Sequence, residues 1–293
     1  MVLRATGLNP ATEALMQWIQ QQADDRRDDY ELARRYYGGE HDTAITDRLK
    51  KFLPPRLAFR DNFMNVVVDS LSERLKLIGF NSEDEDFAEW AWDLWQQNRM
   101  DYTQVVVHTE AVMLGDSYIL CDWDQETERP RWTHQMPEMI LPHYNETNRQ
   151  IDWVSKKWIS HPHIGDEPET RLNLYYPDRV EKYRAKGGIW ARYQDEMDEE
   201  WPVPWLDRAG APLGIPLIHF RNRPMGNDFG QSEIINVIPM QDLLNKTLID
   251  LTMILDTLAF PQRYTLNVNH NSSRLEIMPG SVAEFHSEYD GGS

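Results

Sequence analysis

Few side chains in this 293-residue sequence are spaced for chemistry. The most metal-like group is the pair His161 and His163, followed by Asp166 and Glu167. Two histidines two positions apart can reach one ion from a strand, and carboxylates could complete the ligand set. A proline and turn-forming residues interrupt this spacing, so we interpret the segment as an exposed loop and predict no metal site.

The candidate nucleophiles are no better placed. Gly115-Asp116-Ser117 lacks the second glycine of a GxSxG elbow and lies between a helix and a strand, the reverse of what that motif needs. Cys121 lies in the apolar run YILC, which is typical of a buried, inert thiol. Neither a GxxxxGKS/T phosphate loop nor a GxGxxG motif after a strand is present, and no carboxylate pair stands out. We therefore predict no catalytic residue and no cofactor.

The charge balance limits the partners of the chain. It has 30 Lys and Arg against 48 Asp and Glu, a net charge of −18. This balance argues against a protein that grips nucleic acid phosphates over a broad surface, although DNA could still pass it without being held. The start of the sequence is too polar for a signal peptide, and the most apolar helix is interrupted by charges, so we expect no membrane span and a soluble, intracellular protein.

Most of the helices that we expect lie in the first part of the sequence. Apolar spacing predicts helices over residues 11–37, 62–77 and 102–114, with another after the acidic run NSEDED at 81–86. Acidic side chains before a helix most often stabilise it by interacting with the positive end of the helix dipole, and we interpret that run in this way. The expected core-facing side chains of the helix over 62–77 and just after it are Phe63, Val66, Val67, Leu71, Leu75 and Ile78. In the helix after the acidic run they are Trp90, Leu94 and Trp95.

Strands are expected from Asp116 onward. Alternating segments separated by turn-forming residues predict an antiparallel meander, and the expected strands are 117–123, 130–144, 151–159, 171–176 and 179–193. Three more short strands, 262–268, 274–277 and 281–286, follow a long helix near the end. The fold class predicted from these elements is α+β.

That long helix, residues 230–262, organises the chain. Ser232 can cap its start, Pro239 allows a kink and Pro261 marks its stop. One face is expected to form the core within the subunit: Leu243, Leu244, Leu248, Leu251, Leu255 and Leu258, together with Met240 and Ile254.

The opposite face of the long helix carries a second apolar strip, Ile249, Met253 and Phe260. Three such side chains would be poorly used on a wet surface, because burying each contributes roughly 1.5–3 kcal/mol. Two interpretations stay open at this point. The helix can be packed on two sides within one domain, or it can pack outward on an identical neighbouring subunit.

Seven segments in a fixed order suggest a family. They are RYYGGEH (35–41), NVVVDSLSERLKLIGF (65–80), VMLGDSYILCDW (112–123), MPEMILPHY (136–144), LNLYYPDRVEKYR (172–184), LGIPLIHFRN (213–222) and GQSEIINVIPMQDLLNKTLIDL (230–251). Together they resemble a portal protein of tailed double-stranded-DNA bacteriophages, of the siphophage type. The last segment, which is similar to the loop and first stem helix of that family, is the most specific.

The resemblance implies a domain order. A wing of helices and antiparallel sheet is expected over 1–228, a first stem helix over 229–262 and the start of a small β clip over 263–293. Portal proteins continue into a second stem helix, a tunnel loop and a crown, so we expect this sequence to lack the C-terminal part. The strip Ile249, Met253 and Phe260 would then contact the stem helix of the next subunit.

The resemblance also implies a function. The expected protein is a non-enzymatic head–tail connector, a ring of about twelve copies at the capsid vertex, assembled in the host cytoplasm and kept in the virion. Double-stranded DNA would be packaged and ejected through it without sequence-specific binding. The implied partners are the terminase packaging motor, major capsid and scaffold proteins, and head-completion or tail adaptor proteins. Two alternatives remain: another head–tail adaptor or scaffold-binding protein, and a metal-dependent hydrolase or nuclease. Which acids would face the channel is not predicted.

Overall fold

The structure is a computed structural model, and it describes residues 8, 10–40, 61–124, 127–161, 167–195, 198–226, 228–259, 263–266 and 282–285. The chain divides into two compact units. The first comprises Met1–His41 and Asn62–Ile238, and the second comprises Asp42–Asp61 and Pro239–Ser293. Each unit is described by itself.

Four helices of the first unit confirm the predicted helical segments. They are α1 (Pro10–Tyr37), α3 (Met64–Ser72), α4 (Glu85–Gln97) and α5 (Met100–Leu114). Asp84 caps α4 by accepting a hydrogen bond from the backbone N–H of Phe87 at 3.2 Å, as the acidic run before this helix favours. Gly115, with φ +97°, ends α5 and turns the chain directly into the first strand.

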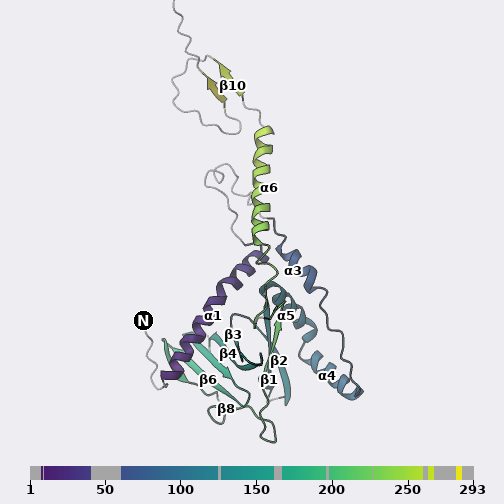
Figure 1. Cartoon of the computed structure of the whole chain (residues 1–293), viewed down its shortest axis with the longest axis vertical. Helices are drawn as coiled ribbons and strands as arrows, with labels where there is room; N and C mark the ends of the chain where they lie inside the picture. Colours follow the sequence, from purple (N-terminus) through teal and green to yellow (C-terminus); the bar gives the residue numbers. More distant parts are fainter. Residues whose placement is uncertain are drawn as a thin grey trace, which may run out of the picture. The chain divides into compact units, whose positions relative to one another are not determined.

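The strands of the first unit form two sheets (Figure 1). A three-stranded sheet has the order β2-β1-β9, and a larger sheet has the order β3-β4-β5-β6-β7, with β8 paired to β6. The bounds are β1 (Asp116–Asp124), β2 (Arg129–Gln135), β3 (Ile140–Tyr144), β4 (Ile151–Ser160), β5 (Glu169–Tyr175), β6 (Arg179–Lys186), β7 (Ile189–Arg192), β8 (Val203–Pro204) and β9 (Leu217–Arg221).

Strand alternation divides the apolar side chains of this unit among its layers. In β3, Ile140 packs into the cluster shared with the three-stranded sheet, whereas its neighbour Leu141 packs against α1. In β1, Tyr118 belongs to the cluster between the sheets, and Ile119 packs with α4 and α5. Successive side chains of a strand point to opposite faces, so both sheets are covered on both sides. The first half of α1 therefore covers the larger sheet, and α4 with α5 cover the three-stranded sheet. The second half of α1 packs against α3 and α5.

The α+β class and the antiparallel meander are confirmed, but two of the expected strands are each divided in two. The expected strand over 179–193 is the hairpin of β6 and β7. The predicted strand over 130–144 is two strands, β2 and β3, which belong to different sheets. The chain leaves the first sheet at Pro137 and Glu138, where a turn closes with the backbone N–H of Met139 donating to Met136 at 2.9 Å. Proline lacks a donor for the ladder, so a sheet change at this point costs no strand hydrogen bond.

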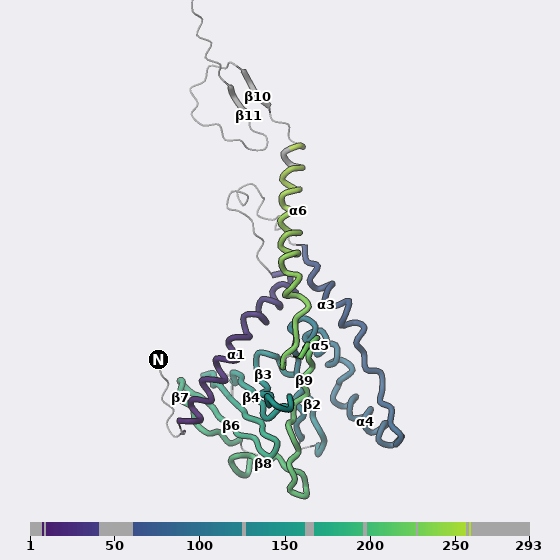
Figure 2. The backbone as a smooth tube through the Cα atoms, viewed as in Figure 1, coloured from purple at the N-terminus to yellow at the C-terminus, as the bar shows by residue number. Residues whose placement is uncertain are grey.

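The second unit contains the long helix α6 (Ile238–Ala259) (Figure 2). It is followed in the sequence by β10 (Arg263–Leu266) and β11 (Val282–Phe285). The two strands pair in parallel, with Arg263 opposite Val282. Two of the three strands predicted after the long helix are therefore present. The third, over 274–277, lies outside the described residues.

The expected inward faces of α3 and α4 are partly wrong. On α3 the buried apolar side chains are Met64 and Val68, while Val66 is exposed. On α4, Leu94 and Trp95 are buried as predicted, but Trp90 is exposed. Both helices have apolar residues on more than one face, so spacing alone could not select the buried one. The other expected core residues found exposed are Phe63, Leu71, Leu75 and Ile78.

An aromatic stack fixes α1 on the larger sheet. His143 of β3 lies 3.5 Å from Trp153 of β4 and 4.9 Å from Trp18 of α1, measured between ring centroids. Burial lowers the pKa of His143 to about 4. Its Nε2 atom is buried and has no hydrogen-bond partner among the described residues. The ring is therefore neutral in the folded protein at pH 7.

This stack should make stability depend on pH. Below pH 6.5 the unfolded chain takes up a proton at His143 that the folded chain resists until about pH 4. The free energy of unfolding should fall by about 2 kcal/mol from this group between pH 7.5 and pH 5. His143→Phe keeps the stacking and should remove this contribution, which urea unfolding at the two pH values would measure. His161→Gln, at an exposed position, is the control and should keep the wild-type difference. An unchanged difference in His143→Phe would contradict the assignment.

Candidate functional site

The helix α6 was the predicted organising element, and it begins later than predicted. Residues 233–237 form turns, and the α-helix starts at Ile238 with Pro239 as its second residue. Proline fits the first turn of a helix because the missing N–H has no partner there. Ser232 caps the turns that precede the helix, where its Oγ accepts a hydrogen bond from the N–H of Ile234 at 3.1 Å. Pro239 therefore starts the helix instead of kinking it.

One face of α6 is held by two amide side chains. The Gln241 Nε2 group donates to the backbone carbonyl of Asp61 at 2.6 Å, and the backbone N–H of Asp61 donates to Asn245 Oδ1 at 3.0 Å. Gln241, Asn245 and Ile249 follow at steps of four, so they share a face, and all three are buried. The buried amides have backbone partners, which offsets their loss of water.

The leucine face of α6 is exposed. Ile249 is 2% exposed, whereas Leu243, Leu251, Leu255 and Leu258 are between 49% and 73% exposed. Within the single chain, therefore, Ile249 is covered, and these four leucines of the expected intrasubunit core are exposed. Gln241 and Asn245 lie on the buried face because their amide groups form hydrogen bonds with the backbone of Asp61. The sequence alone does not indicate this partner.

The remaining members of both predicted strips are intermediate or lie outside the description. Leu244, Leu248 and Met253 are half-buried, and Phe260 lies outside the described residues. Exposure within one chain does not test which surface a neighbouring subunit covers. The assignment of either strip to a subunit interface therefore stays a prediction. Of the two faces, the leucine face is the one that the single chain leaves exposed.

The segment before α6 is bonded to the junction of α5 and β1. The backbone N–H of Asn222 donates to Gly115 at 2.8 Å, and that of Glu233 donates to Val112 at 3.0 Å. Ser232 Oγ donates to the carbonyl of Met113 at 2.5 Å. These bonds fill carbonyls at the C-terminal end of α5 that the helix leaves free. The lead into α6 is thereby joined to the first unit's core.

Asp116 is the centre of this junction. Its side chain is 0% exposed. Oδ2 accepts from Arg26 Nη2 at 2.5 Å and from the Tyr30 hydroxyl at 3.1 Å. Oδ1 accepts from His219 Nε2 and from the backbone N–H of Gly230, both at 2.8 Å. One buried carboxylate therefore joins α1, β9 and the segment before α6.

The protonation states of its neighbours fit this role. Burial lowers the pKa of His219 more than the adjacent carboxylate raises it, so the imidazole is neutral. With Nε2–H donating to Asp116, the other nitrogen accepts from the Tyr144 hydroxyl at 2.6 Å. Burial raises the pKa of Tyr30, which keeps its hydroxyl protonated as a donor. All four partners of Asp116 donate, so the group acts as a structural acceptor.

Gly230 is a second requirement of this junction. A Cβ atom at Gly230 would lie 1.9 Å from the backbone oxygen of Gly115 and 2.7 Å from the backbone nitrogen of Asn222. Both neighbours are main-chain atoms, so they cannot rotate away. The sequence signals here were only two separate glycines and an acid between a helix and a strand, which do not reveal one another.

Substitution at Gly230 should therefore be costly. Gly230→Ala should lower the free energy of unfolding by about 1–3 kcal/mol, because the backbone must shift to admit the methyl group. Chemical unfolding would measure this change. Gly79→Ala is the matched control, since a Cβ there meets no atom within 4 Å and its φ is not positive, and it should leave stability within about 0.5 kcal/mol. Equal stability of the two variants would refute the close approach.

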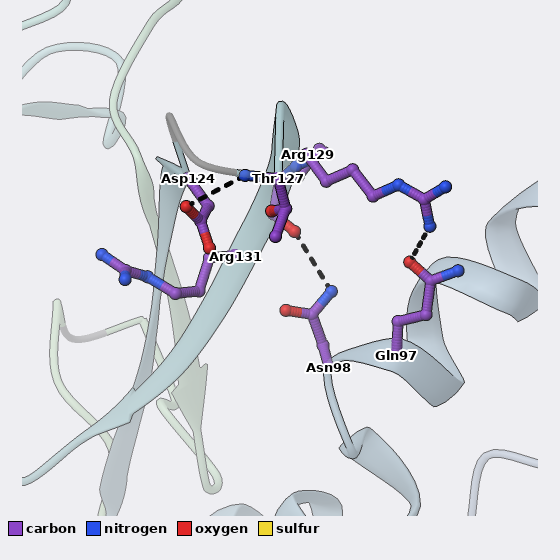
Figure 3. Close-up of a pocket in the computed structure, with 7 residues that line it drawn as sticks. Gln97, Asn98, Asp124, Thr127, Arg129 and Arg131 are labelled. Carbon is purple, nitrogen blue, oxygen red and sulfur yellow. Dashed lines mark hydrogen bonds between the residues drawn. The ribbon is translucent and has the colours of Figure 1, made fainter.

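No catalytic or metal centre is found in the described part of the chain. A hollow of about 410 Å³ lies between the end of α4 and the β1–β2 hairpin (Figure 3). Its polar groups bond one another: Asn98 Nδ2 donates to the carbonyl of Pro130 at 3.2 Å, and Arg129 donates to Gln97. No three metal-ligating side chains gather among the described residues.

The other groups weighed from sequence do not add chemistry. Residues 162–166, with most of the predicted His–Asp loop, lie outside the described residues. Burial raises the pKa of Cys121, as expected of an inert thiol. Within the described ranges, no helix combines the length and apolar character that crossing a bilayer requires.

Comparison with known proteins decides what this architecture is. Residues 16–270 match the family described as phage portal protein, SPP1 Gp6-like. The chain belongs to this portal protein family. The match begins within α1 and ends beyond β10, so it includes the Asp116 junction and the whole of α6. The resemblance found from seven ordered segments is thereby confirmed.

Two relatives of this portal family member come from mycobacterial viruses. The portal protein of Mycobacterium phage D29 is 26% identical over 215 residues, and that of Mycobacterium phage L5 is 25% identical over the same length. Each alignment covers 70% of this chain and 41% of the relative. The chain therefore matches less than half of the length of these relatives.

Proposed function

We propose that this chain is a structural subunit of a phage portal, a ring at the capsid vertex through which double-stranded DNA is packaged and ejected. The observation that carries the proposal is the family match over residues 16–270. It favours this function over a different head–tail adaptor and over a metal-dependent hydrolase or nuclease. No catalytic activity of its own is assigned to the chain, and the energy of packaging would come from a separate motor.

The proposed domain order follows from the elements. Residues 1–228 would be the wing, 229–262 the first stem helix and 263–293 the start of the clip. Helices and antiparallel sheets in the first unit, a single long helix and a short strand pair support this order. In the structure the helix starts at Ile238, and residues 229–237 form the bonded lead into it.

The stem is where subunits would meet. The exposed face of α6 carries Leu243, Leu251, Leu255 and Leu258, and an isolated soluble helix seldom leaves such a stripe in water. A ring repeats one heterologous contact around an axis, so one exposed stripe per subunit can be covered by a different surface of its neighbour. We infer that the leucine face of α6 is one side of that contact.

We also propose the number of copies in the ring and the proteins that it contacts. The ring would hold about twelve copies and would contact the terminase motor, capsid and scaffold proteins, and head-completion or tail adaptors. DNA would pass without sequence-specific binding, which the net charge of −18 supports because few retained phosphate contacts are available. Assembly would occur in the host cytoplasm and the finished ring would stay in the virion.

Electron microscopy of the purified full-length protein tests the function. Closed rings with a central hole are the expected particles. A population of monomers at micromolar protein concentration, or open filaments, would reject the proposal. Size-exclusion chromatography with light scattering on the same sample would give the number of subunits.

A further inference from the structure

The outer face of α4 carries two large aromatic side chains that are not part of the core of the first unit. Phe87 and Trp90 are 55% and 54% exposed, and their ring centroids lie 5.8 Å apart. Residues three apart lie on one side of a helix, so the two rings form one exposed ridge. We call this pair the aromatic ridge.

The inner face of α4 is already complete. Leu94 and Trp95 are buried, and Trp95 packs edge-to-face with Phe80 at 5.8 Å and with Trp132 at 6.4 Å. Trp95 and Met100 belong to the core cluster that α4 and α5 share with the three-stranded sheet, beside which the two helices lie (Figure 1). The ridge is therefore additional to the core of this unit.

The ridge is surrounded by negative charge. Residues 83–93 contain no lysine or arginine, and six exposed carboxylates occur among them: Glu83, Asp84, Glu85, Asp86, Glu89 and Asp93. None of the six forms an ion pair within the described part of the chain. Two acids of α1 differ, since Arg27 lies 3.7 Å from Asp24 and 3.9 Å from Glu31.

Helix capping explains only part of this charge. Asp84 caps α4, and Glu85 and Asp86 lie in the first turn, where the helix dipole favours them. Glu89 and Asp93 lie beyond that turn, so the dipole does not account for them. Asp86 and Asp93 are four residues before and three residues after Trp90, which places carboxylates on both sides of the ring along the helix.

We propose that this face of α4 docks a basic amphipathic helix of a partner protein. The aromatic ridge would insert between apolar side chains of that helix, and the carboxylates would pair with its lysines and arginines. Charge complementarity selects this occupant over a second copy of the same face, because residues 83–93 hold six carboxylates and no lysine or arginine, so two such faces would repel each other. The inference goes beyond the portal function and does not depend on it.

A labelled lysine–leucine amphipathic peptide is the probe, and its binding to this chain would be followed by fluorescence anisotropy. The ridge variant Phe87→Ser/Trp90→Ser keeps every charge and should weaken binding by at least about tenfold, as expected for central aromatic anchors. The charge variant Glu85→Gln/Glu89→Gln/Asp93→Asn keeps the ridge. It should weaken binding about tenfold or more at low salt and much less at about 0.3 M salt, where screening removes the attraction.

The matched control is Trp123→Ser, at an exposed tryptophan of β1 in the same unit, and it should bind like the wild-type chain. Because the substituted side chains are exposed, all variants should keep the wild-type unfolding midpoint. Equal binding by the ridge variant and the wild type would overturn the proposal, since attraction to the overall negative charge would then suffice. Absence of saturable binding by the wild type would overturn it as well. So would loss of wild-type oligomers in the ridge variant by sedimentation velocity, which would make this face a contact between copies.

Discussion

Replacing Asp116 by alanine should lower the free energy of unfolding by about 3–5 kcal/mol, the usual cost of removing one partner from a buried ion pair. The carboxylate is fully buried and accepts from Arg26, Tyr30, His219 and the backbone of Gly230. Without it, four donors from three parts of the chain lose their common acceptor. Urea unfolding followed by circular dichroism would measure the loss.

The variant Asp116→Asn separates the acceptor role from the volume of the side chain. Asparagine has nearly the same shape, but its amide nitrogen would face two of the four donors. It should therefore restore little of the lost stability. Asp152→Ala, at an exposed position of β4, is the control and should change stability by no more than about 0.5 kcal/mol. A stable Asp116→Asn variant would show that the site needs only a polar side chain of this size.

Asp116 also illustrates what the sequence could predict. The helix, the glycine turn and the strand around it were all predicted, because each depends on local periodicity and turn chemistry. The four partners were not predictable. They come from residues 26, 30, 219 and 230, and only the tertiary fold brings such distant positions together. The sequence around Asp116 lacks the pattern of a serine elbow, and it contains no local signal of a structural centre.

The faces of the helices show the same limit. Periodicity places Trp90 and Leu94 on one side of α4, yet only Leu94 is buried. In α6, the leucine stripe has the strongest periodicity, yet Gln241 and Asn245 lie on the buried side. A hydrophobic pattern reports which side chains share a face. It does not report which face the chain itself covers when a helix has two apolar sides, or when buried amides find backbone partners.

Leu255→Asp and Ile249→Asp should separate assembly from folding. Leu255 is 57% exposed on the leucine face of α6, so a charge there should leave the subunit folded. If that face contacts a neighbour, the charge must be buried in every contact of the ring, and the fraction of full-length protein in rings should fall more than tenfold. Each buried leucine contributes roughly 1.5–3 kcal/mol, a loss that recurs at each subunit boundary. Light scattering and electron microscopy would measure assembly.

Ile249→Asp is the complementary change, because Ile249 is 2% exposed in the single chain. A carboxylate there has to be desolvated on folding, so the second unit should lose about 2–5 kcal/mol of stability, whatever the state of assembly. Circular dichroism and limited proteolysis of the second unit would detect this loss. The reverse result, with Leu255→Asp assembling normally and Ile249→Asp folding but not assembling, would assign the subunit contact to the strip of Ile249, Met253 and Phe260. The pair therefore decides which face of the helix a neighbour covers, because one substitution acts through contacts between chains and the other through contacts within one.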